Sequence, residues 1–341
     1  MRDMDRRTFL LTTGRWLAVA ALAPTLSGCA RLLNWSDSGG GQSDSDTASN
    51  EGQSSSTTAT GTSTSQSTTT TLRGGPDLAV IRGDSPDLNV RAAVAQLGGM
   101  ERFVKPKAKV VVKPNVLTGR APEYAVCTNP IVVGTIVRMC FEAGAAQVTV
   151  LDHSTSSPRP AFQEAGLTQA TQAAGGTVKY LNNHDFETVQ IPGAQALTSC
   201  QLVPDVLEAD TFINVPICKV HSLAGLTLSM KNLMGIVGAG RANIHSKMAT
   251  KLTDLSAFVK PQLVILDAHR ILVRNGPGGG RLSDVVLTKT CVAGTNQVTI
   301  DAYGCKIMGW HPMDLPALAA AAKRGLGDPD LSHHVIYEGT A

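Results

Sequence analysis

The sequence has few charged residues and lacks the short motifs of several large enzyme classes. Asp, Glu, Lys and Arg make up 17% of its 341 residues, below the usual share of about 25%. The formal net charge is only +3, which argues against nucleic-acid binding, because contact with phosphate backbones needs concentrated positive charge. The G-x-S-x-G turn of esterases is absent, which argues against an esterase of that class. The H-E-x-x-H spacing of zinc peptidases is absent too.

The cysteines are never closely spaced. There are seven, with no C-x-x-C and no ferredoxin-like run among them, so their spacing gives no support to an iron–sulfur cluster. A cluster built from distant cysteines stays open as an alternative. Cys29 stands alone near the N-terminus. We expect the other six to be buried or unpaired thiols, with room for one disulfide among them: Cys127, Cys140, Cys200, Cys218, Cys291 and Cys305.

No apolar run near the N-terminus is long enough to cross a bilayer. The run from Trp16 to Leu26 contains a proline and falls short of the roughly 20 residues that a membrane span needs. Before it, Arg6 and Arg7 precede Thr-Phe-Leu, which resembles a twin-arginine export signal. After it, Leu-Ser-Gly-Cys29 resembles a lipobox, whose cysteine is acylated.

These motifs predict an exported lipoprotein that is anchored to a membrane through Cys29 and faces the periplasm or the cell exterior. The alternative is an ordinary signal peptide with a chance cysteine. Residues 1–29 are then the signal, and residues 30–75 form a tether rich in Ser, Thr and Gly. The tether has no apolar pattern that could offset the entropy cost of ordering it. Residues 76–341 remain as the folded domain.

The rest of the chain alternates between two kinds of segment. Short runs rich in Val, Ile and Leu are typical of strands that are covered on both faces; they lie at 77–84, 109–115, 147–154, 210–221, 262–270 and 284–294. Helical patterns lie at 85–99, 128–144, 246–261, 296–310 and 314–325. We expect an α/β fold with a mostly parallel sheet and helices on both faces, as a single large domain or two lobes.

Polar residues follow the apolar part of four predicted strands. Parallel strands end at the same edge of a sheet, where α/β proteins bind ligands, so these side chains should converge. Polar residues at a strand end are normal, because every strand must exit into solvent. Four strands that each end in Lys, Asp or His are more than solvation requires, which favours a shared site. The residues are Lys113, Asn115, Asp152, His153, Lys219, His221, Asp267 and His269.

Residues 213–238 carry the densest group of polar residues. Lys219 and His221 are two positions apart, so they share one side of an extended strand. Residues 226–238 are apolar nearly all round, which predicts a buried helix, and a lysine in such a helix needs an anionic partner or an exit to water. Lys231 and Asn232 could therefore complete an anion site, whose partner is a phosphate, a carboxylate, or Asp152 or Asp267 of the protein itself. The alternative is a surface position for Lys231.

A second interpretation of these residues is a divalent-metal site. Asp152, His221, His245 and Asp267 have the right ligand types, but they show no metal-binding spacing. An iron–sulfur cluster has less support still.

The motifs V-V-V-K-P-N, V-T-V-L-D-H-S and P-x-x-K-x-H followed by T-x-x-x-K-N-x-x-G resemble those of the bacterial and archaeal family called domain of unknown function 362. The resemblance covers roughly residues 77–325, and its most specific positions are Pro216, Lys219, His221, Thr227, Lys231, Asn232 and Gly235. The resemblance implies no activity and no catalytic residues. Some members carry a ferredoxin-like module, which this chain lacks.

We expect an enzyme whose site lies at the carboxyl edge of the sheet. Asp152, His221 and Asp267 are the candidates for acid–base work or metal binding. The candidates for holding a small anionic substrate are Lys113, Asn115, Lys219, Lys231 and Asn232. The sequence leaves two alternatives open: a redox protein that uses Cys127, Cys218 and Cys305, and a non-catalytic lipoprotein that binds an anionic solute.

Overall fold

The apolar runs of the sequence form the central sheet of the structure. The computed structural model describes residues 75–341, which lie within one unit. The predicted export signal, the lipid on Cys29 and the tether up to residue 74 lie outside the described residues. Within residues 75–341, no helix combines the length and the apolar character that a membrane crossing requires.

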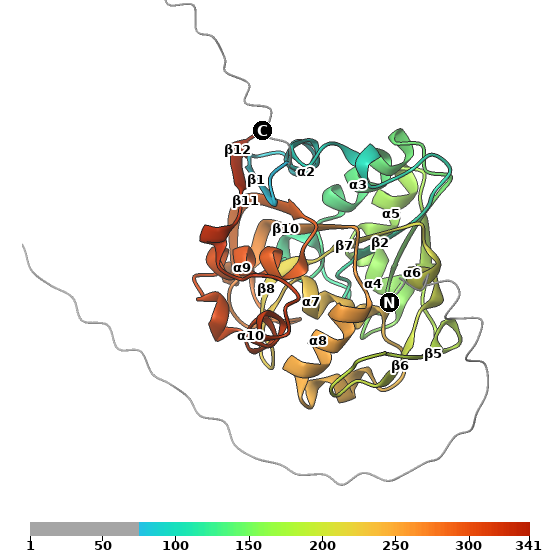
Figure 1. The fold of residues 1–341 in the computed structure, drawn as a ribbon. Helices are drawn as coiled ribbons and strands as arrows, with labels where there is room; N and C mark the ends of the chain where they lie inside the picture. The colour runs from blue at the N-terminus through green and yellow to red at the C-terminus, as the bar shows by residue number, and fades with distance from the viewer. Residues whose placement is uncertain (1–74) are drawn as a thin grey trace, which may run out of the picture. The chain divides into compact units, whose positions relative to one another are not determined.

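The sheet is mixed but mostly parallel, as the sequence predicts (Figure 1). Strand β11 runs antiparallel to both of its neighbours, whereas the other pairs along the main path are parallel. The spatial order is β12 (Ile336–Thr340), β1 (Leu78–Arg82), β11 (Val285–Gly294), β10 (Leu263–Leu272), β7 (Thr211–Val215), β2 (Lys109–Pro114), β3 (Gln147–Asp152) and β4 (Thr177–Tyr180).

Two short pairings lie beside this path. After Pro216 the chain continues as β8 (Ile217–His221), which pairs with β10 and forms a hairpin with β9 (Gly225–Thr227). Strands β5 (Glu187–Gln190) and β6 (Ser199–Leu202) form a separate antiparallel pair.

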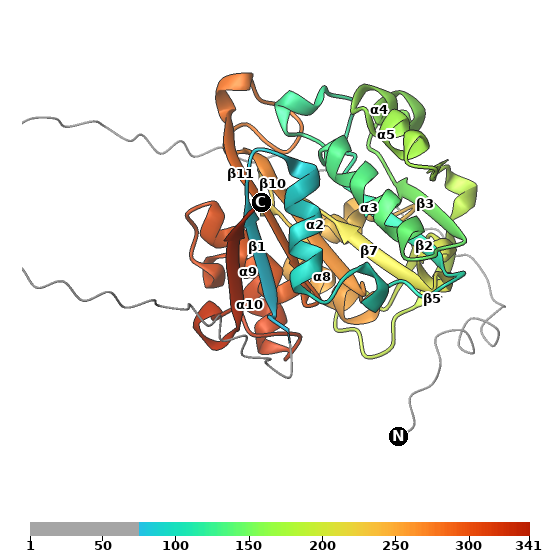
Figure 2. The same cartoon turned by 90° about the horizontal axis from the view of Figure 1, so that it is seen from above.

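Helices cover both faces of the sheet (Figures 1 and 2). Figure 2 shows α2 and α3 lying across the strands. On that face lie α2 (Pro86–Gln96), α3 (Pro130–Glu142), α4 (Pro158–Glu164) and α5 (Leu167–Ala173). On the other lie α6 (Pro204–Glu208), α7 (Ser229–Asn232), α8 (Met248–Phe258), α9 (Gln297–Ile307) and α10 (Pro316–Lys323).

The predicted starts of α2 and α3 are confirmed. Ser85 accepts a hydrogen bond from the backbone N–H of Leu88, and Asn129 accepts one from Ile131. Each cap is followed by proline at the first helical position, where the missing N–H costs no intrahelical bond.

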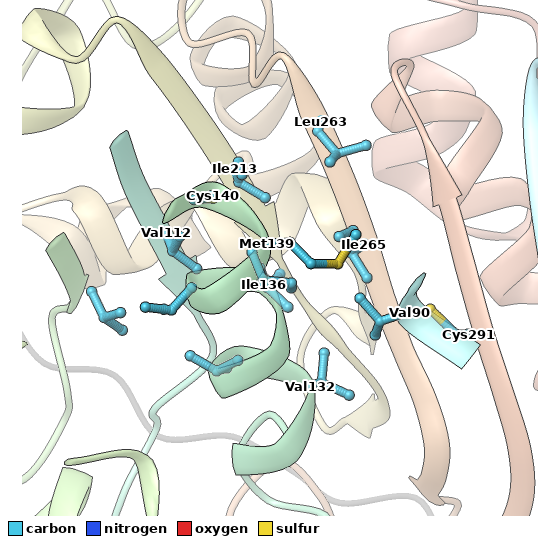
Figure 3. Packing of buried hydrophobic residues seen from close by; sticks show 14 of the residues in the cluster. Val90, Val112, Val132, Ile136, Met139, Cys140, Ile213, Leu263, Ile265 and Cys291 are labelled. Atoms are coloured by element: carbon cyan, nitrogen blue, oxygen red, sulfur yellow. The ribbon is translucent and has the colours of Figure 1, made fainter. Parts of the chain in front are cut away.

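Burial of both sheet faces explains why the strands read as continuous apolar runs. In β10, Leu263 and Ile265 pack toward α3, whereas Val264 and Leu266 pack on the opposite side. Figure 3 shows Ile136 and Met139 of α3 among the side chains of β2, β7 and β10.

The order of the strands reverses beside β2. From β2 the chain proceeds to β3 and β4 on one side, and then returns to form β7 on the other side of β2. At such a reversal the connections leave the sheet in opposite directions, and a crevice opens at the carboxyl ends of the strands.

The predicted helix over 226–238 is wrong. The chain there forms β9, the four-residue α7 and a 3₁₀ turn, Leu233–Ile236. The carboxylate of Asp301 accepts the backbone N–H groups of Ser229 and Met230 at 2.6 and 3.0 Å, which fixes the start of α7. At Gly235 a Cβ would lie only 1.7 Å from Oδ1 of Asp152, so the backbone passes directly against that carboxylate.

Candidate functional site

A cavity of about 200 Å³ lies at the carboxyl ends of β2 and β3, where the strand order reverses. Most of the predicted site residues line it. These are Lys113, Asn115, Asp152, His153, Lys219, His221, Lys231, Asn232 and His245.

A buried ion pair joins β2 to β3 at one wall of the cavity. Nζ of Lys113 lies 2.7 Å from Oδ1 of Asp152, and both side chains are almost fully buried. The other carboxylate oxygen of Asp152 accepts the backbone N–H of Val116 at 2.5 Å. Burial lowers the pKa of Lys113, whereas the charge of Asp152 raises it. Asp152 is thus held in place by its partners.

Asn232 connects the elements around this pair. Its Oδ1 accepts hydrogen bonds from Lys113 Nζ at 3.0 Å and from Asn115 Nδ2 at 2.9 Å. Its Nδ2 donates to Oδ1 of Asn214 on β7 at 2.8 Å. Among residues 75–341, the buried Oδ1 of Asn115 finds no hydrogen-bond partner, so it remains free to accept a donor from a ligand.

Lys219 extends from β8 into the cavity and is 1% exposed. Its Nζ donates to the carbonyl oxygens of Val126 at 2.5 Å and Pro277 at 3.1 Å. No carboxylate in the described part of the chain forms an ion pair with it. Burial lowers the pKa of Lys219 to about 8.

Lys231 lies on α7 and has no hydrogen-bond or ion-pair partner within residues 75–341. Burial, together with the nearby charges of Lys219 and Arg241, lowers its pKa to about 8. The surface position that the sequence left open is not what the structure has, because Lys231 lines the cavity.

The sequence prediction missed Arg241. Its guanidinium donates to the carbonyl oxygen of His153 and lines the cavity. Arg241 begins a 3₁₀ turn, Arg241–His245, so no strand end precedes it. The glycines on either side of Ala239 were the only local sign of a tight turn here.

The rings of His221 and His245 both line the cavity, with 6.1 Å between their centroids. Nδ1 of His221 accepts the backbone N–H groups of Leu223 and Ala224, so the neutral ring carries its proton on Nε2. Nδ1 of His245 lies 3.1 Å from the carbonyl of Ala242, so the neutral ring there carries its proton on Nδ1 and leaves Nε2 as an acceptor. Burial and Lys231 lower the pKa of His221 to about 3.

Asp267 was predicted at the site, but the structure places it elsewhere. Its carboxylate accepts the backbone N–H of Asn129 at 2.7 Å and that of His269 at 3.0 Å, and burial raises its pKa to about 6. Asp267 is not a strand end, because β10 continues to Leu272. His269 also lies outside the cavity.

The predicted metal set is therefore not assembled. Asp152 pairs with Lys113, and Asp267 is not among the residues that line the cavity with His221 and His245. Among the residues that the structure describes, no three or more His, Cys, Asp or Glu side chains come together as a metal site. The donor set does not fit a divalent metal held by those four residues.

The cysteines do not converge either. The six in the described region are free thiols, and all but Cys200 are buried. Cys218 and Cys305 belong to the core beside α9, whereas Cys127 belongs to the core on the other face of the sheet. These three do not form the ligand set of a cluster.

Positive charge dominates the cavity. Four cationic side chains face a single carboxylate, that of Asp152, which leaves an excess of three positive charges when the histidines are neutral. The cationic residues are Lys113, Lys219, Lys231 and Arg241. The arrangement can hold a ligand with two or three negative charges.

The comparison with known families agrees with the motifs. The model of the family described as Domain of unknown function (DUF362) matches residues 110–306. The chain belongs to the DUF362 family. In this DUF362 protein the characteristic residues beyond Pro216 all line the cavity: Lys219, His221, Thr227, Lys231, Asn232 and Gly235.

A thylakoid-associated protein of Synechocystis sp. is 29% identical to this DUF362 chain over 252 residues, which cover 70% of the chain and 74% of that relative. Two solved structures are more distant. The lactate racemase apoprotein of Thermoanaerobacterium thermosaccharolyticum has a TM-score of 0.40 at 11% identity, with 69% of this chain and 57% of that chain covered. A protein of Thermotoga maritima has a TM-score of 0.39 at 11% identity, with 67% and 60% covered. The chain thus spans less than two thirds of either solved structure.

Proposed function

We propose that this protein is an enzyme. It binds a small molecule bearing a carboxylate or phosphate group in the cavity, and transfers a proton between that molecule and side chains of the cavity. The observation that carries the proposal is that Lys219, Lys231 and Arg241 face one cavity while none of them forms an ion pair within residues 75–341.

Anion binding follows from the cost of this arrangement. Cations taken out of water lose hydration, and the loss is recovered only through an oppositely charged partner. Burial lowers the pKa of Lys219 and of Lys231 to about 8 each, which reflects this loss. A bound anion supplies the missing partner, and the free Oδ1 of Asn115 accepts a hydroxyl or amine of the same molecule.

Proton transfer is supported by the groups beside the lysines. With a pKa of about 8, Lys231 stays mostly protonated at neutral pH but releases its proton more readily than an exposed lysine, which suits a general acid. The Nε2–H of His221 can donate a hydrogen bond, and Nε2 of His245 can accept one. We therefore assign the acid–base role to Lys231, His221 and His245, and give Asp152 the role of positioning Lys113.

The cavity volume of about 200 Å³ limits the size of the charged part of the substrate. Pockets for drug-sized ligands usually measure about 300–1,000 Å³. A group of a few heavy atoms with one or two acidic functions fits this space.

We also propose that the protein is exported by the twin-arginine route and anchored through Cys29. The order of arginine pair, short apolar run and lipobox supports this. The Synechocystis relative is a thylakoid-associated protein, which is in keeping with a membrane-related location.

The test begins with binding. The full chain carrying Cys29→Ser, which lacks the predicted lipid attachment site, is titrated calorimetrically with inorganic phosphate, oxalate and pyruvate. Lys231→Gln should weaken binding at least tenfold, because one cation of the cavity is lost. The control Lys323→Gln, at an exposed position on α10, should leave affinity unchanged. Equal affinity in both variants, or no binding by the parent protein, contradicts an anion site at Lys231.

Proton transfer is tested in heavy water. Exchange of carbon-bound hydrogen for deuterium in pyruvate, followed by proton NMR, should depend on Lys231 and survive in Lys323→Gln. Tight binding without exchange supports instead a non-catalytic protein that captures an anionic solute, since the same unpartnered cations would serve that role.

A further inference from the structure

A second cavity, of about 140 Å³, lies next to the first and shares Lys231 with it. Its walls are mainly apolar. They include Leu226, Leu228, Met248, Leu252 and Leu315. Leu226 belongs to β9, Leu228 directly precedes α7, Met248 and Leu252 belong to α8, and Leu315 directly precedes α10. All lie on the face of the sheet opposite α3.

The β8–β9 hairpin borders both cavities. The ring of His221 lines the first, whereas Leu223, Ala224 and Gly225 line the second. The backbone N–H groups of Leu223 and Ala224 donate to Nδ1 of His221. The same turn thus fixes the ring on one side and forms an apolar wall on the other.

The second cavity offers little to a polar ligand. Asp301 lines it, but both oxygens of its carboxylate accept backbone N–H groups, those of Ser229 and Met230. The remaining charged side chain there is Lys231, whose methylene stem can lie along apolar surface while its ammonium group reaches toward charge.

We infer that the two cavities are two parts of one ligand site, which takes a molecule with an anionic head and an apolar tail of about six carbon atoms. The inference rests on the proposed function for the head. Lys231 sits where head and tail meet, so its Nζ lies beside the acidic group while the tail enters between α8 and α10.

The size of the tail follows from the volume. An apolar protein cavity of about 150 Å³ stays dry and binds benzene, and the second cavity has nearly this volume. An apolar pocket of this size beside the charged cavity therefore has room for such a tail.

Monoalkyl phosphates test the inference directly, because they hold the head constant. The full chain with Cys29→Ser is titrated with inorganic phosphate and with methyl, butyl, hexyl and decyl phosphate. Affinity should rise about fourfold for each methylene that becomes buried, up to a length of about six carbons, and should stop rising at decyl phosphate.

A variant that fills the second cavity provides the matched test. Ala249→Phe places a ring in this cavity, so the rise in affinity with chain length should vanish. Ala257→Phe lies on the same helix but lines neither cavity, and it should keep the rise. Ala249→Leu, a smaller change, should shorten the optimal chain if the Phe variant does not fold.

The outcomes separate this inference from the proposed function. If inorganic phosphate fails to bind, the proposed anion site falls. If phosphate binds but the alkyl chain brings no gain, or the gain persists in Ala249→Phe, the anion site stands and the two-part site is overturned.

Discussion

Lys113 and Asp152 form a buried ion pair that fastens β2 to β3 beside the strand reversal, with 2.7 Å between Nζ and Oδ1. Asn232 and the backbone N–H of Val116 complete the hydrogen bonding around it. The pair therefore forms one fixed wall of the cavity that Lys219, Lys231 and Arg241 also line.

Breaking this pair on one side should destabilise the protein strongly. Asp152→Asn leaves the Lys113 charge buried without its partner, and such changes typically cost about 3–5 kcal/mol. The free energy of unfolding, measured with urea, should fall by that amount. The double variant Lys113→Met with Asp152→Leu removes both charges and should recover much of the loss. A single-variant cost below about 1 kcal/mol contradicts the buried pair.

Gly235→Ala should damage the site through a steric contact. The added Cβ would meet Oδ1 of Asp152 at 1.7 Å and Nζ of Lys113 at 2.7 Å, so the ion pair must move. We expect a loss of phosphate affinity together with a lower melting temperature.

Gly309→Ala is the control for this change. Gly309 has a φ of +71°, but nothing lies within 4 Å of the position that an added Cβ would take, so only the backbone cost of about 1–2 kcal/mol applies. Phosphate affinity should be unchanged in this variant. A Gly235→Ala protein that binds phosphate normally would show that the backbone does not approach Asp152 so closely.

The strand-end prediction succeeded where local sequence determines where a strand ends. Lys113 and Asp152 each follow a short run of Val or Leu near the ends of β2 and β3, and parallel pairing brings such ends together. Lys219 reaches the cavity from the middle of β8, the short strand that follows Pro216. Asp267 failed this rule because β10 runs on past it to Leu272, with an irregularity between Ala268 and Arg270.

Two other features depend on contacts that no local pattern encodes. The apolar pattern of residues 226–238 is equally compatible with one long helix. The start of α7 is fixed by Asp301, which lies about 70 residues further along the chain. Arg241 reaches the cavity from a 3₁₀ turn. Such a turn shows neither the alternation of a strand nor the period of a helix, so the sequence pattern does not predict it.

The lysines of the cavity should make anion binding fall with rising pH. Lys219 and Lys231 must be protonated to attract an anion, and the pKa of each is about 8 in the empty protein. Phosphate affinity, measured by calorimetry from pH 7 to 10, should decline above pH 8. A constant affinity across this range is incompatible with lysine-based binding.

The stability of the empty protein should follow the opposite trend. Between pH 8 and about 10.5, the unfolded chain keeps protons that the folded lysines have released, so the free energy of unfolding rises with pH. Lys231→Gln removes part of this rise. The measurement is the difference in urea unfolding between the parent protein and this variant at each pH, which cancels the titration of other groups.

The N-terminal motifs predict two separable defects. Cys29→Ser should abolish incorporation of labelled palmitate, because the acylated residue is gone. Replacing Arg6 and Arg7 by lysine should leave the protein unexported, as shown by cell fractionation. Cys200→Ser, at a partly exposed cysteine of the domain, should be labelled normally. Labelling that persists in Cys29→Ser rules out the predicted anchor.

Because the strand order reverses beside β2, the cavity forms only when distant parts of the chain have folded together. Its walls are drawn from four stretches that lie far apart in the chain, around residues 113–117, 152–155, 219–245 and 277. A fragment that ends before residue 219 contains β2 and β3 but only part of the binding surface. Ligand affinity is therefore a property of the completed fold, and a bound anion favours the native state over every partial one, by about 2.7 kcal/mol at a hundredfold excess over Kd.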